Sequence, residues 1–222
     1  CGLGVTDLAG IQLADAVLED VVLGEARLAG ARIEGSTFKG THFVGVNLDA
    51  AVFHQTRFVD CHFAFGSMRR TEFTQCVFEN CTSDKAGFAG ALFTGCTFEG
   101  LADQMSDFSG AELEECRFKG FNLRNTAFSR TCFRNVEFAD GCMDSVVFSQ
   151  IRHRGLTVRG SSLTQCGFDD CQYDGLTLED CTIKALSLAG AKISGLTIRA
   201  CPVVHGLRAV RKLARPGGEV WR

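Results

Sequence analysis

The 222-residue chain has little of several features that would assign it to a class at once. It holds two prolines, one tryptophan and one tyrosine, and its 22% charged residues leave a formal net charge of -3. This composition argues against a disordered chain, and the near-neutral balance excludes a strongly basic nucleic-acid-binding protein. No run approaches the roughly 18 consecutive apolar residues that span a bilayer. We therefore expect a soluble protein that binds neither a membrane nor nucleic acid directly.

Motifs that carry chemistry are also missing. The chain has no Cys-x-x-Cys pair, no His-Glu-x-x-His segment and no glycine-rich phosphate loop leading into a helix. These spacings are the usual signs of zinc sites, metalloproteases and nucleotide-binding sites. We therefore predict no catalytic residue, no cofactor and no metal site.

What the chain has in excess is 25 glycines, 19 phenylalanines and 12 cysteines. These residues follow a period of five. Every fifth position from Leu3 to Val203 carries a large apolar side chain in 38 of 41 cases, and 17 of the phenylalanines lie there. Only Ser83, Asp103 and His153 break the rule. We call these positions the centres, and their unbroken phase indicates a repeat protein.

Two further positions of each five-residue unit are marked. The residue two before each centre, the small slot, is usually small, and ten of the twelve cysteines occupy it. The residue two after each centre is rich in Gly, Asp and Asn, which tolerate the dihedral angles of a tight corner. Because five fits neither the helical period of 3.6 nor the strand period of 2.0, the chain must turn once per unit. Four units then close one square coil, and about ten coils make a rod on the order of 50 Å long.

The small slot and the centre share one fixed interior volume. Eight small slots hold a large residue, and none of their eight centres is Phe, whereas about three would be expected by chance. Large side chains in the two positions therefore exclude each other, as in a close-packed interior. The eight slots are Ile11, Leu101, Phe121, Ile151, Leu156, Leu176, Leu186 and Leu196.

At this point the chain resembles the pentapeptide-repeat family, whose unit is a small residue, a polar residue, Leu or Phe, and two variable residues. Units such as Ala-Arg-Leu-Ala-Gly at 26–30 and Cys-Thr-Phe-Glu-Gly at 96–100 match it closely. The resemblance covers residues 1 to about 203. It implies an all-β fold, a right-handed quadrilateral β-helix, and it does not by itself imply one activity.

The four-unit coil predicts which side chains stack one coil apart. Most cysteines fill a slot that Ala or Thr fills elsewhere, so we interpret them as packed thiols in a reducing, cytoplasmic compartment. Cys132 and Cys142 point outward on opposite sides and are the more reactive thiols by position. The predicted internal stacks are Phe38, Phe58, Phe78, Phe98, Phe118 and Phe138; Phe88, Phe108, Phe128, Phe148 and Phe168; and Cys76, Cys96 and Cys116.

The polar centres Ser83 and Asp103 are one coil apart and so are neighbours on one side. A buried polar group is costly unless it is hydrogen-bonded, and two interpretations stay open. Either a Ser-Asp hydrogen bond or a buried water satisfies the pair inside a regular rod, or the backbone bulges outward and builds a partner contact. The candidate contact residues are Phe65, Asp84, Lys85, Gln104 and Met105.

Histidines raise two smaller questions. His153, between Arg152 and Arg154, is inward by phase, and we expect a tucked, hydrogen-bonded imidazole, with a bulge that exposes a small basic patch as the alternative. His42 and His62 point outward one coil apart, so their rings can meet. Two ligands do not make a zinc site, and we interpret them as surface residues.

The five-residue phase ends after Val203, which predicts a repeat domain at 1–203 and a basic tail at 204–222. Leu207, Val210 and Leu213 form an apolar stripe with basic residues opposite, typical of a short amphipathic helix. Repeat rods need their open ends covered, so capping of the last coil is the plainest role. The alternative is a homodimer or partner contact through this helix, with Trp221 as an anchor.

The charges divide along the chain. Residues 1–200 hold 18 basic and 25 acidic residues, while residues 201–222 hold five basic residues and one acid. Glu112, Glu114 and Glu115 form an acidic cluster on one unit. Because an interior filled with Phe and Leu offers no pocket for a nucleophile and its base, we expect a non-enzymatic binding protein.

The resemblance suggests a partner. The best described activity in the resembling family is binding of bacterial DNA gyrase or topoisomerase IV by imitating the shape and charge of B-form DNA, which protects the enzyme from quinolones. Resemblance therefore implies a bacterial protein with gyrase as partner, contacted through the acidic cluster. The alternative is a scaffold, adaptor or effector domain of a larger protein, favoured by a chain that starts at Cys1 in the middle of the repeat phase.

Overall fold

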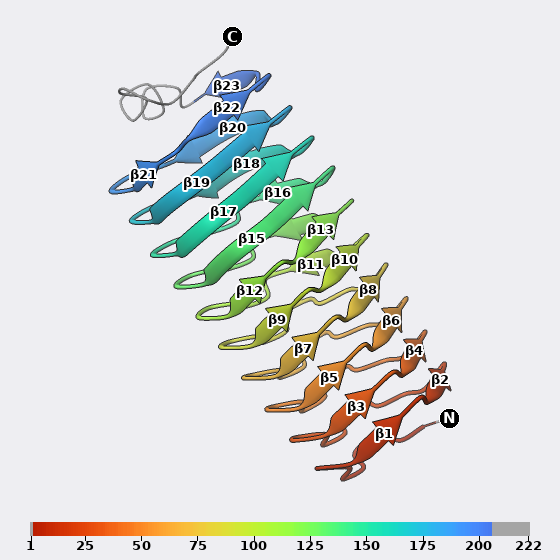
Figure 1. The fold of residues 1–222 in the computed structure, drawn as a ribbon. Helices are drawn as coiled ribbons and strands as arrows, with labels where there is room; N and C mark the ends of the chain where they lie inside the picture. The colour runs from red at the N-terminus through yellow and green to blue at the C-terminus, as the bar shows by residue number, and fades with distance from the viewer. Residues whose placement is uncertain (1, 206–222) are drawn as a thin grey trace.

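A computed structural model describes residues 2–205, and within them all regular structure is β (Figure 1). The chain forms a right-handed quadrilateral β-helix in which each segment pairs in parallel with the equivalent segment of the next coil, from Gly2 with Val22 to Ile183 with Val203. We number the four faces of the rod by their centres. Faces 1, 2, 3 and 4 carry Leu3, Leu8, Leu13 and Leu18, together with the equivalent centres of every later coil.

Faces 3 and 4 form one continuous sheet along the rod. Most of its strands are three residues long, because each unit has only three residues between corners, but three strands in the later coils continue across the corner between the two faces. On face 3 alone lie β1 (Gln12–Ala14), β3 (Arg32–Glu34), β5 (Val52–His54), β7 (Glu72–Thr74), β9 (Leu92–Thr94), β12 (Glu112–Glu114) and β21 (Lys192–Ser194). On face 4 alone lie β2 (Val17–Glu19), β4 (Thr37–Lys39), β6 (Arg57–Val59), β8 (Val77–Glu79), β10 (Thr97–Glu99), β13 (Arg117–Lys119) and β22 (Thr197–Arg199). The strands that cover both faces are β15 (Cys132–Ala139), β17 (Arg152–Arg159) and β19 (Gln172–Glu179).

Face 1 carries the second sheet, while face 2 is joined mainly by isolated parallel bridges such as Asp7 with Arg27. The second sheet begins only at the sixth coil, and below it face 1 is also bridged rather than stranded. Its strands are β11 (Ala102–Gln104), β14 (Asn122–Arg124), β16 (Cys142–Asp144), β18 (Ser162–Gly167), β20 (Thr182–Ser187) and β23 (Val203–His205).

The corners lie where the sequence places them. Every fifth residue from Val5 to Ala200 has a positive φ between 47° and 79°. This left-handed conformation is cheap for Gly and tolerable for Asn and Asp but costs other residues about 1 kcal/mol or more. Corner amides offset part of that cost by donating to the coil above, as Asp60 N does to Glu79 O at 2.9 Å.

The predicted interior ladders are confirmed. Ring centroids of the Phe38 to Phe138 stack are 4.3 to 5.4 Å apart, and those of the Phe88 to Phe168 stack are 4.4 to 5.2 Å apart. Cys76, Cys96 and Cys116 are free buried thiols, as expected. Their thiols donate to backbone carbonyls, Cys96 Sγ to Phe73 O at 3.3 Å for example, which explains why small hydrogen-bonding residues suit this slot.

The bulge interpretation of Ser83 and Asp103 is wrong. Both side chains are buried, with 2% and 3% of their surface exposed, and the coils keep their register, Ser83 N donating to Ala102 O at 3.1 Å. Ser83 Oγ donates to Asp103 Oδ1 at 2.8 Å, and Thr126 Oγ1 donates to Asp103 Oδ2. A complete set of hydrogen bonds therefore removes the reason for the backbone to bulge.

The last described strand, β23, extends through His205 with a register shift opposite Ile183 and Lys184. The tail candidates Leu207, Val210, Leu213 and Trp221 lie outside the described residues. Within residues 2–205 no helix is long and apolar enough to cross a membrane.

Candidate binding face

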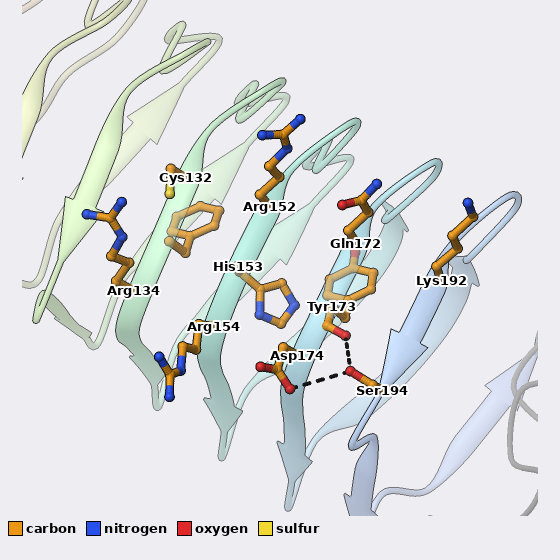
Figure 2. A pocket seen from close by; sticks show the side chains of 11 residues that line it. Cys132, Arg134, Arg152, His153, Arg154, Gln172, Tyr173, Asp174, Lys192 and Ser194 are labelled. Carbon is orange, nitrogen blue, oxygen red and sulfur yellow. Dashed lines mark hydrogen bonds between the residues drawn. The ribbon is translucent and has the colours of Figure 1, made fainter.

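Face 3 carries a shallow hollow near the C-terminal end of the rod (Figure 2). Strands β15, β17, β19 and β21 supply its wall, and the outward side chains of each strand stand at its first and third positions. Successive side chains of a strand alternate between the two faces of a sheet, so the middle residue of each unit turns inward. The hollow is lined by Cys132, Phe133, Arg134, Arg152, His153, Arg154, Gln172, Tyr173, Asp174, Lys192 and Ser194.

The outward residues form two parallel columns, because equivalent residues of successive coils are direct neighbours in the β-ladder. The first column reads Glu112, Cys132, Arg152, Gln172 and Lys192. The second column reads Glu114, Arg134, Arg154, Asp174 and Ser194. The charge therefore changes sign within one coil, between the acids of β12 and the bases of β15 and β17.

Most of these bases have no local partner. The ion pair between Arg134 Nη1 and Glu114 Oε2 is long at 3.8 Å, and within residues 2–205 the side chains of Arg152, Arg154 and Lys192 make no ion pair or hydrogen bond. The free guanidinium groups of Arg152 and Arg154 lie on the same strand and repel each other, so this surface favours an acidic ligand or partner.

Face 4 provides a contrast. There Arg57 pairs with Glu79 at 2.6 Å, and Glu137 pairs with both Arg117 and Arg159. The hydrogen bond from Arg159, followed by that from Arg117, holds the pKa of the Glu137 carboxyl below its usual range. Arg57, Arg117 and Arg159 of face 4 are thus neutralised within the rod, whereas Arg152, Arg154 and Lys192 of face 3 are not.

His153 lies directly beneath the hollow. It is 6% exposed and packs against Tyr173 with ring centroids 4.3 Å apart. Both ring nitrogens lack a hydrogen-bond partner among the described residues, so the expected tucked position is confirmed but the expected hydrogen bond is wrong. Burial lowers the pKa of the imidazole to about 4, against a smaller opposite effect of Asp174, and the ring is neutral at pH 7.

The corner beside face 1 carries an apolar ridge. Phe65 and Met105 are 62% and 52% exposed, and Lys85 Nζ lies 5.3 Å from the centre of the Phe65 ring between them. Asp84 and Gln104 stand beside the ridge on face 1. The five candidate residues therefore do share one surface, although without the bulge, and their role in binding stays a prediction.

Other single residues fall as the phase predicts. The rings of His42 and His62 meet with centroids 4.8 Å apart, and His62 Nδ1 lies 2.9 Å from Thr82 Oγ1. Among residues 2–205 no cluster of three or more His, Cys, Asp or Glu side chains could hold a metal ion. Cys132 is half-buried on face 3 and Cys142 is exposed on face 1.

The sequence analysis identified the acids of face 3 as a candidate contact, but it did not recognise that the bases of the same face form a surface. Along the chain, the arginines between 117 and 159 look like interruptions of an acidic pattern. Sorting the charges into columns, one residue per coil, separates them, because Arg117 and Arg159 belong to face 4 while Arg152 and Arg154 belong to face 3. That signal was present in the sequence.

Family models identify the repeat itself. The model "Pentapeptide repeat region" matches residues 31–105, and the model "Pentapeptide repeats (8 copies)" matches residues 6–45 and 106–150. The chain belongs to the pentapeptide-repeat family. A search of curated protein sequences found no significant match.

The chain is also similar to solved structures of pentapeptide-repeat proteins. HetL, involved in heterocyst differentiation regulation in the cyanobacterium Nostoc sp. strain PCC 7120, is 14% identical with a TM-score of 0.49, over 86% of each chain. A trypsin-treated form of QnrB1, a plasmid-mediated fluoroquinolone resistance protein, is 21% identical with a TM-score of 0.41, over 82% of this chain and 91% of its own. At these identities the likeness concerns the fold alone.

Proposed function

We propose that this protein is a non-enzymatic, protein-binding rod and that face 3 is its recognition surface. The observation that carries the proposal is the separation of charge on face 3, with unpaired bases in β17 and β21 next to the acids of β12. Such a surface gives a partner both orientation and specificity.

DNA gyrase or topoisomerase IV is the narrower form of this proposal. It is supported by the family resemblance and by the acidic balance of residues 1–200. An imitation of DNA presents negative groups along its length, and Glu112, Glu114 and Glu115 would contribute them on face 3. The bases above them limit the acidic stretch to one half of the face.

A scaffold or adaptor role is the second candidate, and the mixed charge of face 3 favours it. A partner that carries both signs, as most protein surfaces do, matches this face better than a uniformly basic DNA-binding cleft. This role needs the bases of β17 as much as the acids of β12.

A gyrase supercoiling assay tests the narrower proposal. The purified protein is titrated into the reaction with and without a quinolone, beside a variant in which Glu112, Glu114 and Glu115 are replaced by Lys. Inhibition or drug protection that this variant loses supports the gyrase proposal. The matched control is Glu19→Lys, Glu99→Lys and Glu179→Lys, which makes the same charge change on face 4. If the control loses inhibition or drug protection equally, net charge alone explains the effect. If micromolar unchanged protein has no effect on supercoiling, gyrase is rejected as the partner.

For the adaptor candidate, binding to any identified partner is compared between the acid reversal and Arg152→Glu with Arg154→Glu. Loss of binding in both variants, but not in the face 4 control, places the contact on face 3. Binding that survives both reversals contradicts face 3 as the recognition surface. The apolar ridge of Phe65 and Met105 is then the next candidate for the contact.

A further inference from the structure

We propose that a second copy of this chain binds face 3, with the two rods antiparallel and related by a two-fold axis that crosses the face at Cys132 and Arg134. This inference rests on the proposed function, since it names a partner for the same face. In a two-fold contact each residue meets the residue at the mirrored height on its partner. With the axis at Cys132, a residue one coil below it meets the residue one coil above.

The first column is self-complementary about this axis. One coil away from Cys132, Glu112 faces Arg152 of the second copy. Three coils away, Glu72 faces Lys192. The uncharged Leu92 and Gln172 lie opposite each other between these pairs, so no like charges meet in this column.

The second column repeats the pattern with different residues. One coil from Arg134, Glu114 faces Arg154 of the second copy. The two copies of Arg134 meet at the axis, where each is already accompanied by its own Glu114 at 3.8 Å. Together the columns make three opposite-charge pairs on each side of the axis, over a length of about 29 Å for six coil rises of about 4.8 Å.

Other arrangements fit less well. Moving the axis by half a coil toward the C-terminus brings Arg134 opposite Arg154 and Glu114 opposite Asp174, so that like charges meet. Parallel rods place each coil against itself, so that Glu112 meets Glu114 and Arg152 meets Arg154. Like charges directly opposite are destabilising. Moving the axis by half a coil toward the N-terminus avoids them but keeps only one kind of opposite-charge pair, Glu114 with Arg134, so the register at Cys132, with three kinds, is the one that the charges favour most.

The free rods supply a reason to associate. Within each copy Arg152, Arg154 and Lys192 have no partner among residues 2–205, and the acids of β12 crowd on one coil, so both groups are repelled by their own neighbours. Pairing relieves both repulsions at once. Because the pairs stay near solvent, each contributes little alone, and their combined effect is a salt-sensitive dimer with a fixed register.

Charge exchange between two variants gives a sharp test. One variant carries Glu112→Arg with Glu114→Arg, and the other carries Arg152→Glu with Arg154→Glu. Each variant alone brings like charges together, while an equimolar mixture restores opposite charges at every exchanged position. We expect sedimentation velocity at low salt to show a dimer for the unchanged protein, monomers for each variant, and a dimer again for the mixture. For each of these two variants measured alone, the dissociation constant of the homodimer rises on the order of tenfold or more.

Controls separate this result from misfolding and from net charge. A single chain that carries all four substitutions inverts both patches and regains the homodimer. Glu99→Lys with Glu179→Lys on face 4 leaves the dimer intact. In 1 M salt, where the screening length is about 3 Å, the unchanged protein dissociates. The proposal is overturned if each of the two charge variants, measured alone, still dimerises as the unchanged protein does. It is also overturned if the unchanged protein is a monomer at every concentration and salt.

Cys132 marks the axis chemically. A short bis-maleimide, whose two double bonds each add one thiol, joins Cys132 of the two copies and yields a covalent dimer at low salt. Cys132→Ser abolishes this product, whereas Cys142→Ser on face 1 does not. A covalent dimer that depends on Cys142 instead would contradict the face 3 contact.

The outcomes also separate this inference from the proposed function. A monomeric protein that still binds another partner through face 3 rejects only the second copy as occupant. A face 3 dimer that binds no other protein supports the inference and leaves the rod without a further partner on that face.

Discussion

Two polar centres interrupt the apolar interior of this rod, and the rod accommodates them in opposite ways. Asp103 on face 1 is 3% exposed and accepts hydrogen bonds from Ser83 and Thr126. His153 on face 3 is 6% exposed and has no partner for either ring nitrogen among the described residues. Both follow a large residue in the small slot, Leu101 and Ile151, so the space left for the centre is similar in the two places.

The difference lies in the neighbouring coils. Asp103 is stacked on Ser83, and the small slots around it hold Ser106 and Thr126, whose hydroxyls favour the charged carboxylate against the larger effect of burial, which raises its pKa. His153 is stacked between Phe133 and Tyr173, which offer rings instead of acceptors. Of these two polar centres, only the one with hydroxyl residues in the adjacent coils is hydrogen-bonded.

Removing the hydroxyls around Asp103 produces the largest effect. Ser83→Ala with Thr126→Val leaves Ser106 as the remaining hydrogen-bond partner of the buried carboxyl, and we expect a loss of about 3–5 kcal/mol in the free energy of unfolding, at about 1.5–3 kcal/mol for each lost hydrogen bond to a charged group. Urea denaturation at neutral pH measures it. The control is Thr71→Val with Thr131→Val, since those hydroxyls bond only to neutral carbonyls and cost about 1 kcal/mol each. Equal losses in the two double variants would contradict a special role of the carboxyl.

Replacing His153 acts in the other direction. His153→Leu removes two unpaired ring nitrogens and keeps a side chain that fits beside Ile151, so we expect a gain of about 1–3 kcal/mol. Denaturant midpoints of the two proteins provide the measurement. His153→Phe, which overfills the shared volume, should not gain as much. A destabilised leucine variant would imply an unseen partner for the imidazole.

Acid sensitivity follows from the same residue. The pKa of His153 lies at about 4 in the fold and near 6.5 when the chain is unfolded. The unfolded chain therefore binds the proton more readily, and stability falls as the pH drops from about 6.5 to about 4. Asp103, whose pKa is raised, has the opposite sign and loses stability as the pH rises above its unfolded value. Stability measured against pH for the unchanged protein and for His153→Leu isolates the histidine, and parallel curves would refute this assignment.

The smallest effect belongs to the outer ridge. Phe65 is 62% exposed one coil below the Ser83 centre, and Phe65→Ser should change the free energy of unfolding by no more than about 0.5 kcal/mol. Thermal denaturation is sufficient to measure it. A larger loss would show that this corner stabilises the fold and is not held free for a partner.

The five-residue period was enough to predict the coil, the corners and the stacked rings, because each depends only on which residues recur at fixed spacing. The hydrogen bond between Ser83 and Asp103 was one of the two interpretations left open, because the period already placed these two centres one coil apart on the same face. The lack of a partner for His153 could not be predicted, since it depends on where single acceptor atoms lie. The basic half of face 3 was overlooked because Arg152 and Arg154 alternate along the chain with arginines of another face.

The closure of each coil after four units has a consequence for insertions and deletions in the reading frame. Losing four units shortens the rod by one coil and leaves every later side chain on its face, at the cost of one layer of stacking. Losing a single unit turns everything downstream by a quarter revolution. A deletion of 126–130, for example, moves Arg152 and Arg154 from face 3 to face 2, away from Glu112. Insertions and deletions in this protein therefore preserve the faces only when they add or remove whole coils. Any other number of units changes which side chains lie together on each face.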